Sequence, residues 1–227
     1  DVAPSRGLGD VYKRQVESGE NVTAVFSQPD KPKGRGYKLT PPPVKEYAVS
    51  QNIPVYQPAS LKKGDDAEEA YETLKKLAPD LIVVVAYGKI LPKRILDLPK
   101  TYCINIHASL LPKYRGAGPI QWCILKGESE TGVTSMIMGE GLDTGDMLIK
   151  AATEIGVNET ADELHDRLAV IGADVLLETI KTGDIHPQPQ DDEMSCYAPM
   201  LTKELCPIDF SKTCLLYTSP SPRDGAT

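Results

Sequence analysis

Short apolar runs alternate with amphipathic stretches from about residue 21 to residue 183. The apolar runs have the length of strands and span residues 21–26, 55–57, 81–86, 102–108, 133–138 and 147–155. The stretches with helical spacing span residues 44–51, 66–77, 119–126 and 161–182. Strands that alternate with helices predict an α/β domain built on a mostly parallel, doubly wound sheet.

Two of these elements have clear local signals. Residues 81–86 read LIVVVA, a continuous apolar run that is typical of a parallel strand covered on both faces. The long helix begins after Thr160, which forms a capping box with Glu163, and Gly183 is expected to end it. Its buried stripe should consist of Leu164, Leu168, Ile171 and Val175. Ligands of such sheets usually bind beyond the carboxyl ends of the strands.

The two ends of the chain lack this pattern. Residues 1–15 and 214–227 carry neither a period of 2 nor one of 3.6, and we expect both to be non-native, such as translated cloning or sequencing adaptor. Disordered native tails are the alternative. Between them, residues 16–183 should form one domain, and residues 184–213, which are rich in Pro and Asp, read as a linker.

Composition narrows the class of protein. No run of about 18 apolar residues exists, so we expect no membrane span. The five cysteines form no CxxC pair and follow no secretory signal, which favours reduced thiols in a cytoplasmic protein. The spacings of the three histidines from the cysteines argue against a zinc site. The net charge of −7 argues against broad nucleic-acid binding but leaves room for a local basic loop.

The segment from residue 103 to residue 119 carries the candidate chemistry. Asn105 and His107 are two residues apart on a strand, so they project from the same face. A second loop, residues 139–146, places Asp143 among three glycines, which let the backbone approach a ligand closely. Taken singly, each of these three residues fits an ordinary structural role. The polar pair lies on a strand otherwise made of Ile104 and Ile106, which does not read as core filler.

The run INIHASLLPKYRGAGPIQW at residues 104–122, followed by GLDTGD at residues 141–146, resembles the folate-dependent formyltransferase family. The resemblance implies that Asn105, His107 and Asp143 are catalytic. It implies 10-formyltetrahydrofolate as the formyl donor and no metal. The folate-binding residues that it implies are Ser109, Leu110, Leu111, Pro112, Tyr87, Gly88, Ile90 and Leu91.

The chemistry suits these residue types. The α-amine that attacks the formyl carbon must be unprotonated, and it titrates near pH 7.7–8.0, so a histidine is a suitable base. Asp143 would hold the imidazole by a hydrogen bond and stabilise its cation, as carboxylates do in acyl-transfer sites. The amide of Asn105 would donate to the oxyanion of the tetrahedral intermediate.

A basic loop narrows the resemblance to the members that formylate initiator methionyl-tRNA. The run VFSQPDKPKGRGYKL at residues 25–39 is similar to their tRNA-binding loop, which implies phosphate contacts by Lys31, Lys33, Arg35 and Lys38. Residues 83–92 and 197–212 also resemble these members. Formylation of a sugar amine or of glycinamide ribonucleotide stays open, as does a catalytically silent fragment that binds folate or RNA.

The chain departs from the family pattern at both ends. The family opens with a strand and a Gly-Thr-Pro-x-Phe turn and closes with a barrel domain, and we expect the first strand and the C-terminal barrel to be missing here. Because that first strand lies in the middle of the sheet, its loss should expose the edges of its neighbours. We expect a monomer in the bacterial cytoplasm, or in an organelle matrix if the source is eukaryotic.

Overall fold

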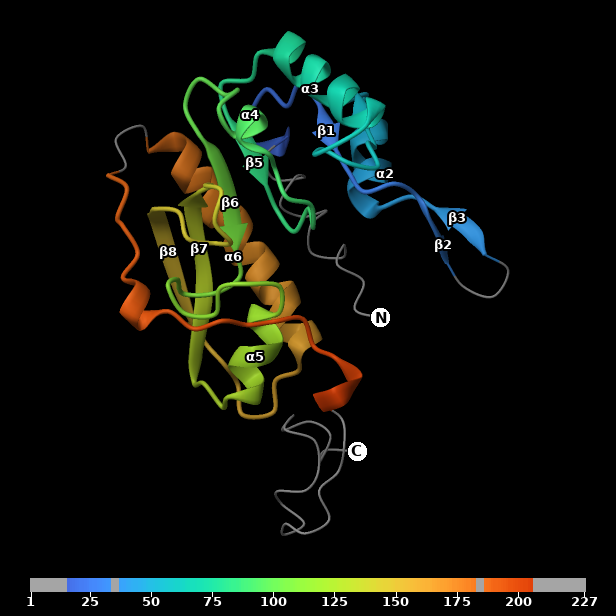
Figure 1. Cartoon of the computed structure of the whole chain (residues 1–227). Coiled ribbons are helices and arrows are strands. Elements are labelled where there is room, and N and C mark those ends of the chain that lie inside the picture. Colours follow the sequence, from blue (N-terminus) through green and yellow to red (C-terminus); the bar gives the residue numbers. More distant parts are fainter. Residues whose placement is uncertain (1–15, 34–36, 183–185, 206–227) are drawn as a thin grey trace.

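The computed structural model describes residues 16–33, 37–182 and 186–205, and strands and helices alternate through this part of the chain (Figure 1). The strands are β1 (Val25–Phe26), β2 (Lys31–Lys33), β3 (Lys38–Thr40), β4 (Val55–Tyr56), β5 (Ile82–Val84), β6 (Cys103–His107), β7 (Glu130–Ile137) and β8 (Met147–Glu154). The helices are α2 (Pro43–Ser50), α3 (Asp65–Leu77), α4 (Lys93–Leu96), α5 (Pro119–Leu125) and α6 (Ala161–Lys181), with 3-10 turns η1 (Asp192–Met194) and η2 (Lys203–Leu205). The segments expected to be non-native, 1–15 and 214–227, lie outside the described residues.

The described strands form three separate sheets. The largest has the order β5-β6-β7-β8, with β5 parallel to β6 and with β7 antiparallel to both of its neighbours. In the two smaller sheets β1 pairs in parallel with β4, and β2 pairs antiparallel with β3. The α/β class is confirmed, but the largest sheet has less parallel pairing than the sequence suggested. One reason is that a direct loop joins β7 and β8 into a hairpin, whereas a parallel pair needs a crossover.

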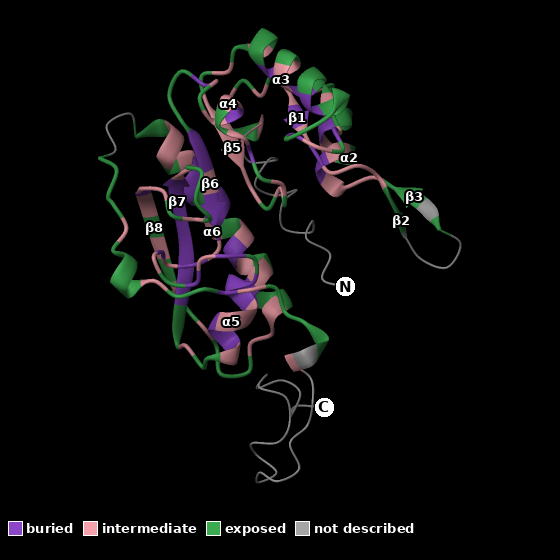
Figure 2. Cartoon of the chain, viewed as in Figure 1, coloured by how far each residue is buried: buried purple, intermediate pink, exposed green. Residues whose placement is uncertain are grey.

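The principal core lies between this sheet and α6. Ile104 of β6 and Val133 of β7 are each 1% exposed, and Leu164 of α6 is fully buried against them. Figure 2 shows the buried residues concentrated along β6 and β7 and on one side of α6. The helix begins with the expected capping box, in which Thr160 accepts from the backbone N–H of Glu163 and its own N–H bonds the Glu163 carboxylate. The sequence therefore predicted this helix correctly, and three residues of its expected stripe, Leu164, Leu168 and Val175, are buried, whereas Ile171 is half-buried.

One expectation about β5 is wrong. All three residues of β5 are only half-buried, although the run of valines was expected to be covered on both faces. The cause is a cavity of about 140 Å³ between β1 and β5, whose lining includes Phe26, Ile82 and Val84. In the described part of the chain no strand pairs with the outer edge of β5, so the sheet of β5 to β8 is not joined to the sheet of β1 and β4.

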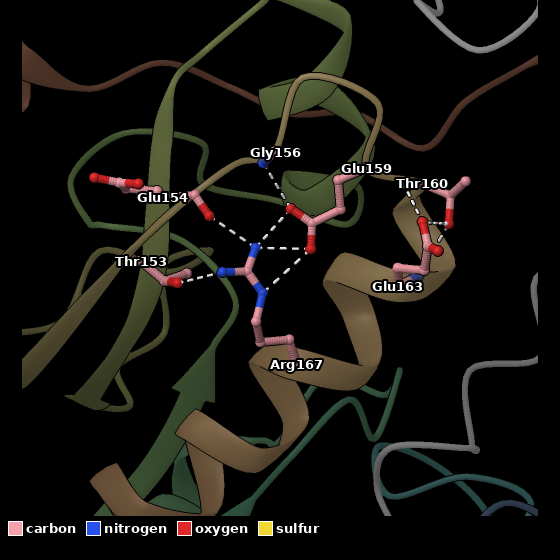
Figure 3. A network of polar contacts seen from close by, with 7 residues as sticks. All are labelled: Thr153, Glu154, Gly156, Glu159, Thr160, Glu163 and Arg167. Carbon is pink, nitrogen blue, oxygen red and sulfur yellow. Dashed lines mark hydrogen bonds and ion pairs between the residues drawn. The ribbon is translucent and has the colours of Figure 1, made fainter. Parts of the chain in front are cut away.

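A polar cluster fixes the connection between β8 and α6 (Figure 3). The guanidinium of Arg167 donates to both carboxylate oxygens of Glu159, at 2.7 and 2.6 Å, to the carbonyl of Glu154 and to the hydroxyl of Thr153. Glu159 also accepts from the backbone N–H of Gly156. The cluster therefore holds the first two turns of α6 against the end of β8.

The segment that reads as a linker is docked on the domain as far as it is described. Residues 186–199, which we call the strap, run past β8 toward α5 (Figure 1). Gln188 exchanges two backbone hydrogen bonds with Met147, and the backbone of Arg115 bonds Cys196 and Ala198. The strap thus lies along the two loops that carry the candidate chemistry.

None of the helices in the described part of the chain has the length and apolar character of a membrane-spanning segment.

Candidate active site

His107 is the last residue of β6, and its imidazole is buried with 7% of the side chain exposed. Its Nε2 lies 2.9 Å from the carbonyl oxygen of Tyr114. A carbonyl can only accept, so Nε2 must carry the proton, and the neutral ring has its lone pair on Nδ1. Tyr114 has φ +60°, and its hydroxyl donates to Glu128 at 2.6 Å. The loop conformation therefore selects the tautomer in which Nδ1 can act as a base.

Asp143 approaches this free nitrogen from the loop between β7 and β8. Its Oδ2 lies 3.7 Å from Nδ1 of His107, and the same oxygen accepts from the backbone N–H of Gly116 at 2.9 Å. A separation of 3.7 Å is too long for a hydrogen bond, so the expected bond between Asp143 and the imidazole is not present in this conformation. The carboxylate is instead placed to attract the ring once Nδ1 is protonated.

Asn105 lies on the same face of β6 as His107, two residues earlier, and opposite Met136 of β7. It is partly exposed, and its side-chain amide has no hydrogen-bond partner among the described residues. A free amide N–H beside the imidazole can donate to an oxygen that develops negative charge. The sequence prediction that the three side chains share one region is supported directly for His107 and Asp143 and by strand geometry for Asn105.

Two of the glycines near Asp143 also have a packing role. A Cβ on Gly145 would lie 1.7 Å from the carbonyl oxygen of Ile137, and one on Gly141 would lie 2.2 Å from the hydroxyl oxygen of Thr144. These glycines allow the loop to pack closely on its own hairpin. A Cβ on Gly139 would meet open space. The expectation that the three glycines let a ligand approach stays a prediction.

Comparison with known proteins identifies the family. The sequence profile of the family described as formyl transferase matches residues 6–180. The chain belongs to the formyl transferase family. It is 54% identical over 200 residues to the methionyl-tRNA formyltransferase of Pelobacter propionicus, which covers 87% of this chain and 61% of that protein. With the methionyl-tRNA formyltransferase of Geobacter sulfurreducens it shares 53% over 203 residues, covering 88% and 63%. The chain thus spans less than two thirds of these relatives.

Solved formyltransferases share the fold. The sugar 3N-formyl transferase WlaRD, crystallised in the presence of dTDP and 5-N-formyl-THF, superposes with a TM-score of 0.68 at 21% identity and covers 92% of this chain and 72% of that one. The phosphoribosylglycinamide formyltransferase of Streptococcus pneumoniae gives a TM-score of 0.65 at 25% identity and covers 78% and 94%. These likenesses establish the α/β formyltransferase fold for the described chain.

In this formyl transferase the loop after His107 is fastened to the sheet. The hydroxyl of Thr134 donates to the carbonyl of Ser109 at 2.7 Å and accepts from the N–H of Leu111 at 3.1 Å. Lys150 donates to the carbonyl of Leu111. Ser109 and Leu111 are buried, whereas Leu110 and Pro112 are partly exposed. Of the four expected folate contacts in this loop, only Leu110 and Pro112 have accessible side chains.

The second expected folate segment follows β5, at the same end of the sheet as His107. Ile90 is 74% exposed, Leu91 is buried, and Gly88 has φ +70°. The hydroxyl of Tyr87 is buried and has no partner among the described residues, and burial raises the pKa of Tyr87 to about 12. Since β5 and β6 are parallel, both loops leave the carboxyl ends of adjacent strands, where ligands of such sheets bind.

The expected RNA-binding loop forms a hairpin of β2 and β3 that projects from the body of the domain (Figure 1). Lys31 is exposed on β2, and Lys33 and Lys38 occupy paired positions of the two strands. Arg35 lies outside the described residues. At the base of the hairpin Lys45 donates to Asp30 at 2.8 Å, and this bond, with a second one from Gln57, holds the pKa of Asp30 below its usual value.

Several functional contacts were not predictable from the sequence. The carbonyl of Tyr114 and the N–H of Gly116 are backbone groups, so no residue type signals them. Gln190 belongs to a segment that reads as a linker, yet it contacts the Asp143 loop.

No cluster of three or more His, Cys, Asp or Glu residues suited to a metal occurs among the residues that the structure describes.

Proposed function

We propose that the chain carries the catalytic domain of a methionyl-tRNA formyltransferase, formed by residues 16–183, with residues 184–213 leading away from it. This domain would transfer the formyl group of 10-formyltetrahydrofolate to the α-amine of methionine on initiator tRNA. The observation that carries the proposal is the buried His107, whose Nδ1 faces Asp143 beside the free amide of Asn105. The names of the relatives and the projecting basic hairpin favour a tRNA acceptor.

The reaction follows from these positions. The amine nitrogen attacks the formyl carbon, and Nδ1 of His107 accepts the proton that the nitrogen loses. Asp143 attracts the resulting imidazolium, and Asn105 donates to the oxyanion of the tetrahedral intermediate. The intermediate then collapses: the bond from the formyl carbon to N10 of the folate breaks, and N10 takes the proton back from His107. Atoms and charges balance without a metal or an oxidant.

Folate and tRNA would each contact a different set of residues. Folate would bind against Leu110, Pro112 and the segment from Tyr87 to Leu91, at the carboxyl ends of β5 and β6. The acceptor end of the tRNA would be bound by Lys31, Lys33, Arg35 and Lys38 of the basic segment at residues 25–39. We further propose that the protein acts as a monomer in the cytoplasm.

A formyl-transfer assay with three arms tests the proposal. Charged initiator tRNA, a sugar amine and no acceptor are each incubated with 10-formyltetrahydrofolate and the 227-residue chain. Formylation of the tRNA alone is expected, and the His107→Ala variant should lose turnover by about 10²–10⁴-fold while it keeps its folate affinity. Formylation of the sugar amine would show that the acceptor is a sugar amine and not the tRNA. Near-normal turnover of the variant would remove His107 from the mechanism.

A further inference from the structure

Gln190 of the strap uses every polar atom of its side chain. Its Nε2 donates to the carbonyl oxygen of Asp143 at 2.8 Å and to that of Gly145 at 2.7 Å, and its Oε1 accepts from Nε of Arg115 at 2.9 Å. Turning the amide over would face its oxygen toward two carbonyls and its N–H groups toward a guanidinium. The side chain therefore has a single favourable orientation.

The loop that Gln190 contacts is one that needs support. Asp143 has φ +52°, a left-handed conformation that costs a non-glycine residue free energy unless its surroundings hold it there. Among the described residues the Asp143 carboxylate accepts one hydrogen bond, from the backbone N–H of Gly116. The backbone of Asp143 and Gly145 is held from the other side by Gln190. Fixing these two carbonyls fixes the direction in which the Asp143 side chain leaves the loop.

The opposite end of the Gln190 amide is tied to the loop that orients His107. Arg115, which donates to Gln190, lies between Tyr114, whose carbonyl accepts from His107, and Gly116, whose N–H bonds Asp143. The backbone of Arg115 is in turn paired with the strap at Cys196 and Ala198. The side-chain amide of Gln190 thus connects the loop that orients the His107 imidazole to the loop that carries the Asp143 carboxylate.

We propose that Gln190 is a positioning residue for the formyl transfer, because its side chain holds the Asp143 loop and the Arg115 loop at the spacing that keeps the Asp143 carboxylate beside Nδ1 of His107. This inference rests on the proposed function, since it acts through Asp143. It also gives the strap a role in the active site.

Two substitutions of Gln190 and one matched control test the role in the full 227-residue chain. Gln190→Met keeps the length of the side chain and removes all three hydrogen bonds. Gln190→Glu keeps the contact with Arg115 but turns an acceptor toward the two carbonyls. Each should lower kcat about 10- to 100-fold and leave the KM values for folate and tRNA within about threefold, because a small misplacement of a catalytic group lowers the rate more than binding. Asp192→Asn removes the negative charge of the exposed partner of Arg115 and should leave kcat unchanged.

A double-mutant cycle separates positioning from a general effect on stability. If Gln190 acts through Asp143, Gln190→Met should lower kcat strongly in the parent chain and hardly at all in an Asp143→Asn background. Equal losses in both backgrounds, or wild-type kcat in a folded Gln190→Met variant, would overturn the proposal. If both Gln190 variants lose the circular dichroism spectrum of the folded chain, Gln190 is a stability residue and the proposal also fails. An inactive parent chain, or full activity of Asp143→Asn alone, would instead refute the proposed function itself.

Discussion

Replacing Asp143 by Asn tests the electrostatic core of the mechanism. The substitution keeps the shape of the side chain and an oxygen for the N–H of Gly116, but it removes the negative charge that lies 3.7 Å from Nδ1 of His107. With an effective dielectric constant near 20, a unit charge pair at that distance attracts by about 4 kcal/mol. Since both side chains are largely buried, little of this attraction is lost to solvent screening.

The imidazolium forms only as the amine loses its proton, so the attraction stabilises the transition state and not the bound substrates. We expect Asp143→Asn to lower kcat by about 10²–10³-fold, with KM values close to those of the parent. Single-turnover formylation of methionyl-tRNA, with enzyme in excess, measures the chemical step. Asp146→Asn makes the same charge change in the same loop and should cost less than about threefold. A kcat within threefold of the parent for Asp143→Asn would refute the electrostatic role.

Three further predictions concern other parts of the chain. Arg35→Ala should weaken tRNA binding about tenfold and leave folate binding unchanged. The slope of the logarithm of the tRNA association constant against the logarithm of salt concentration should become shallower by about one unit. Thiol reagents at pH 8 should modify Cys196, which is exposed, and spare Cys103 and Cys123, because burial raises the pKa of Cys103 to about 12 and that of Cys123 to about 11. Arg167→Met should lower the free energy of unfolding in urea by about 1–2 kcal/mol, a value reduced because the side chain is 37% exposed.

Each of these predictions has a control on the same chain. Lys75→Ala removes a charge from α3, away from the hairpin, and equal losses of tRNA affinity in Lys75→Ala and Arg35→Ala would argue against a specific loop contact. Peptide mapping locates the modified thiols, and rapid labelling of Cys103 in the folded chain would contradict its burial. Lys93→Met breaks the exposed ion pair with Asp97 and should change stability by less than about 0.5 kcal/mol. A similarly small effect for Arg167→Met would show that its cluster adds little.

Much of the architecture was predictable because it is encoded locally. The apolar periods located β6, β7, β8 and α6 to within a few residues, and Thr160 with Glu163 marked the start of α6. The strand period placed Asn105 and His107 on one face without reference to the rest of the chain. The half-buried state of β5 was not predictable, because it depends on what lies beside the strand, which no local pattern records.

The sequence by itself determined which residues we propose as catalytic, since the identities and order of Asn105, His107 and Asp143 are properties of the chain alone. Only the tertiary structure decided how they act. The carbonyl of Tyr114 selects the tautomer of His107, and Gln190 reaches the Asp143 loop across 47 positions of the sequence. Hydrogen bonds between distant loops depend on where the packed elements bring those loops, so periodicity and residue type cannot encode them.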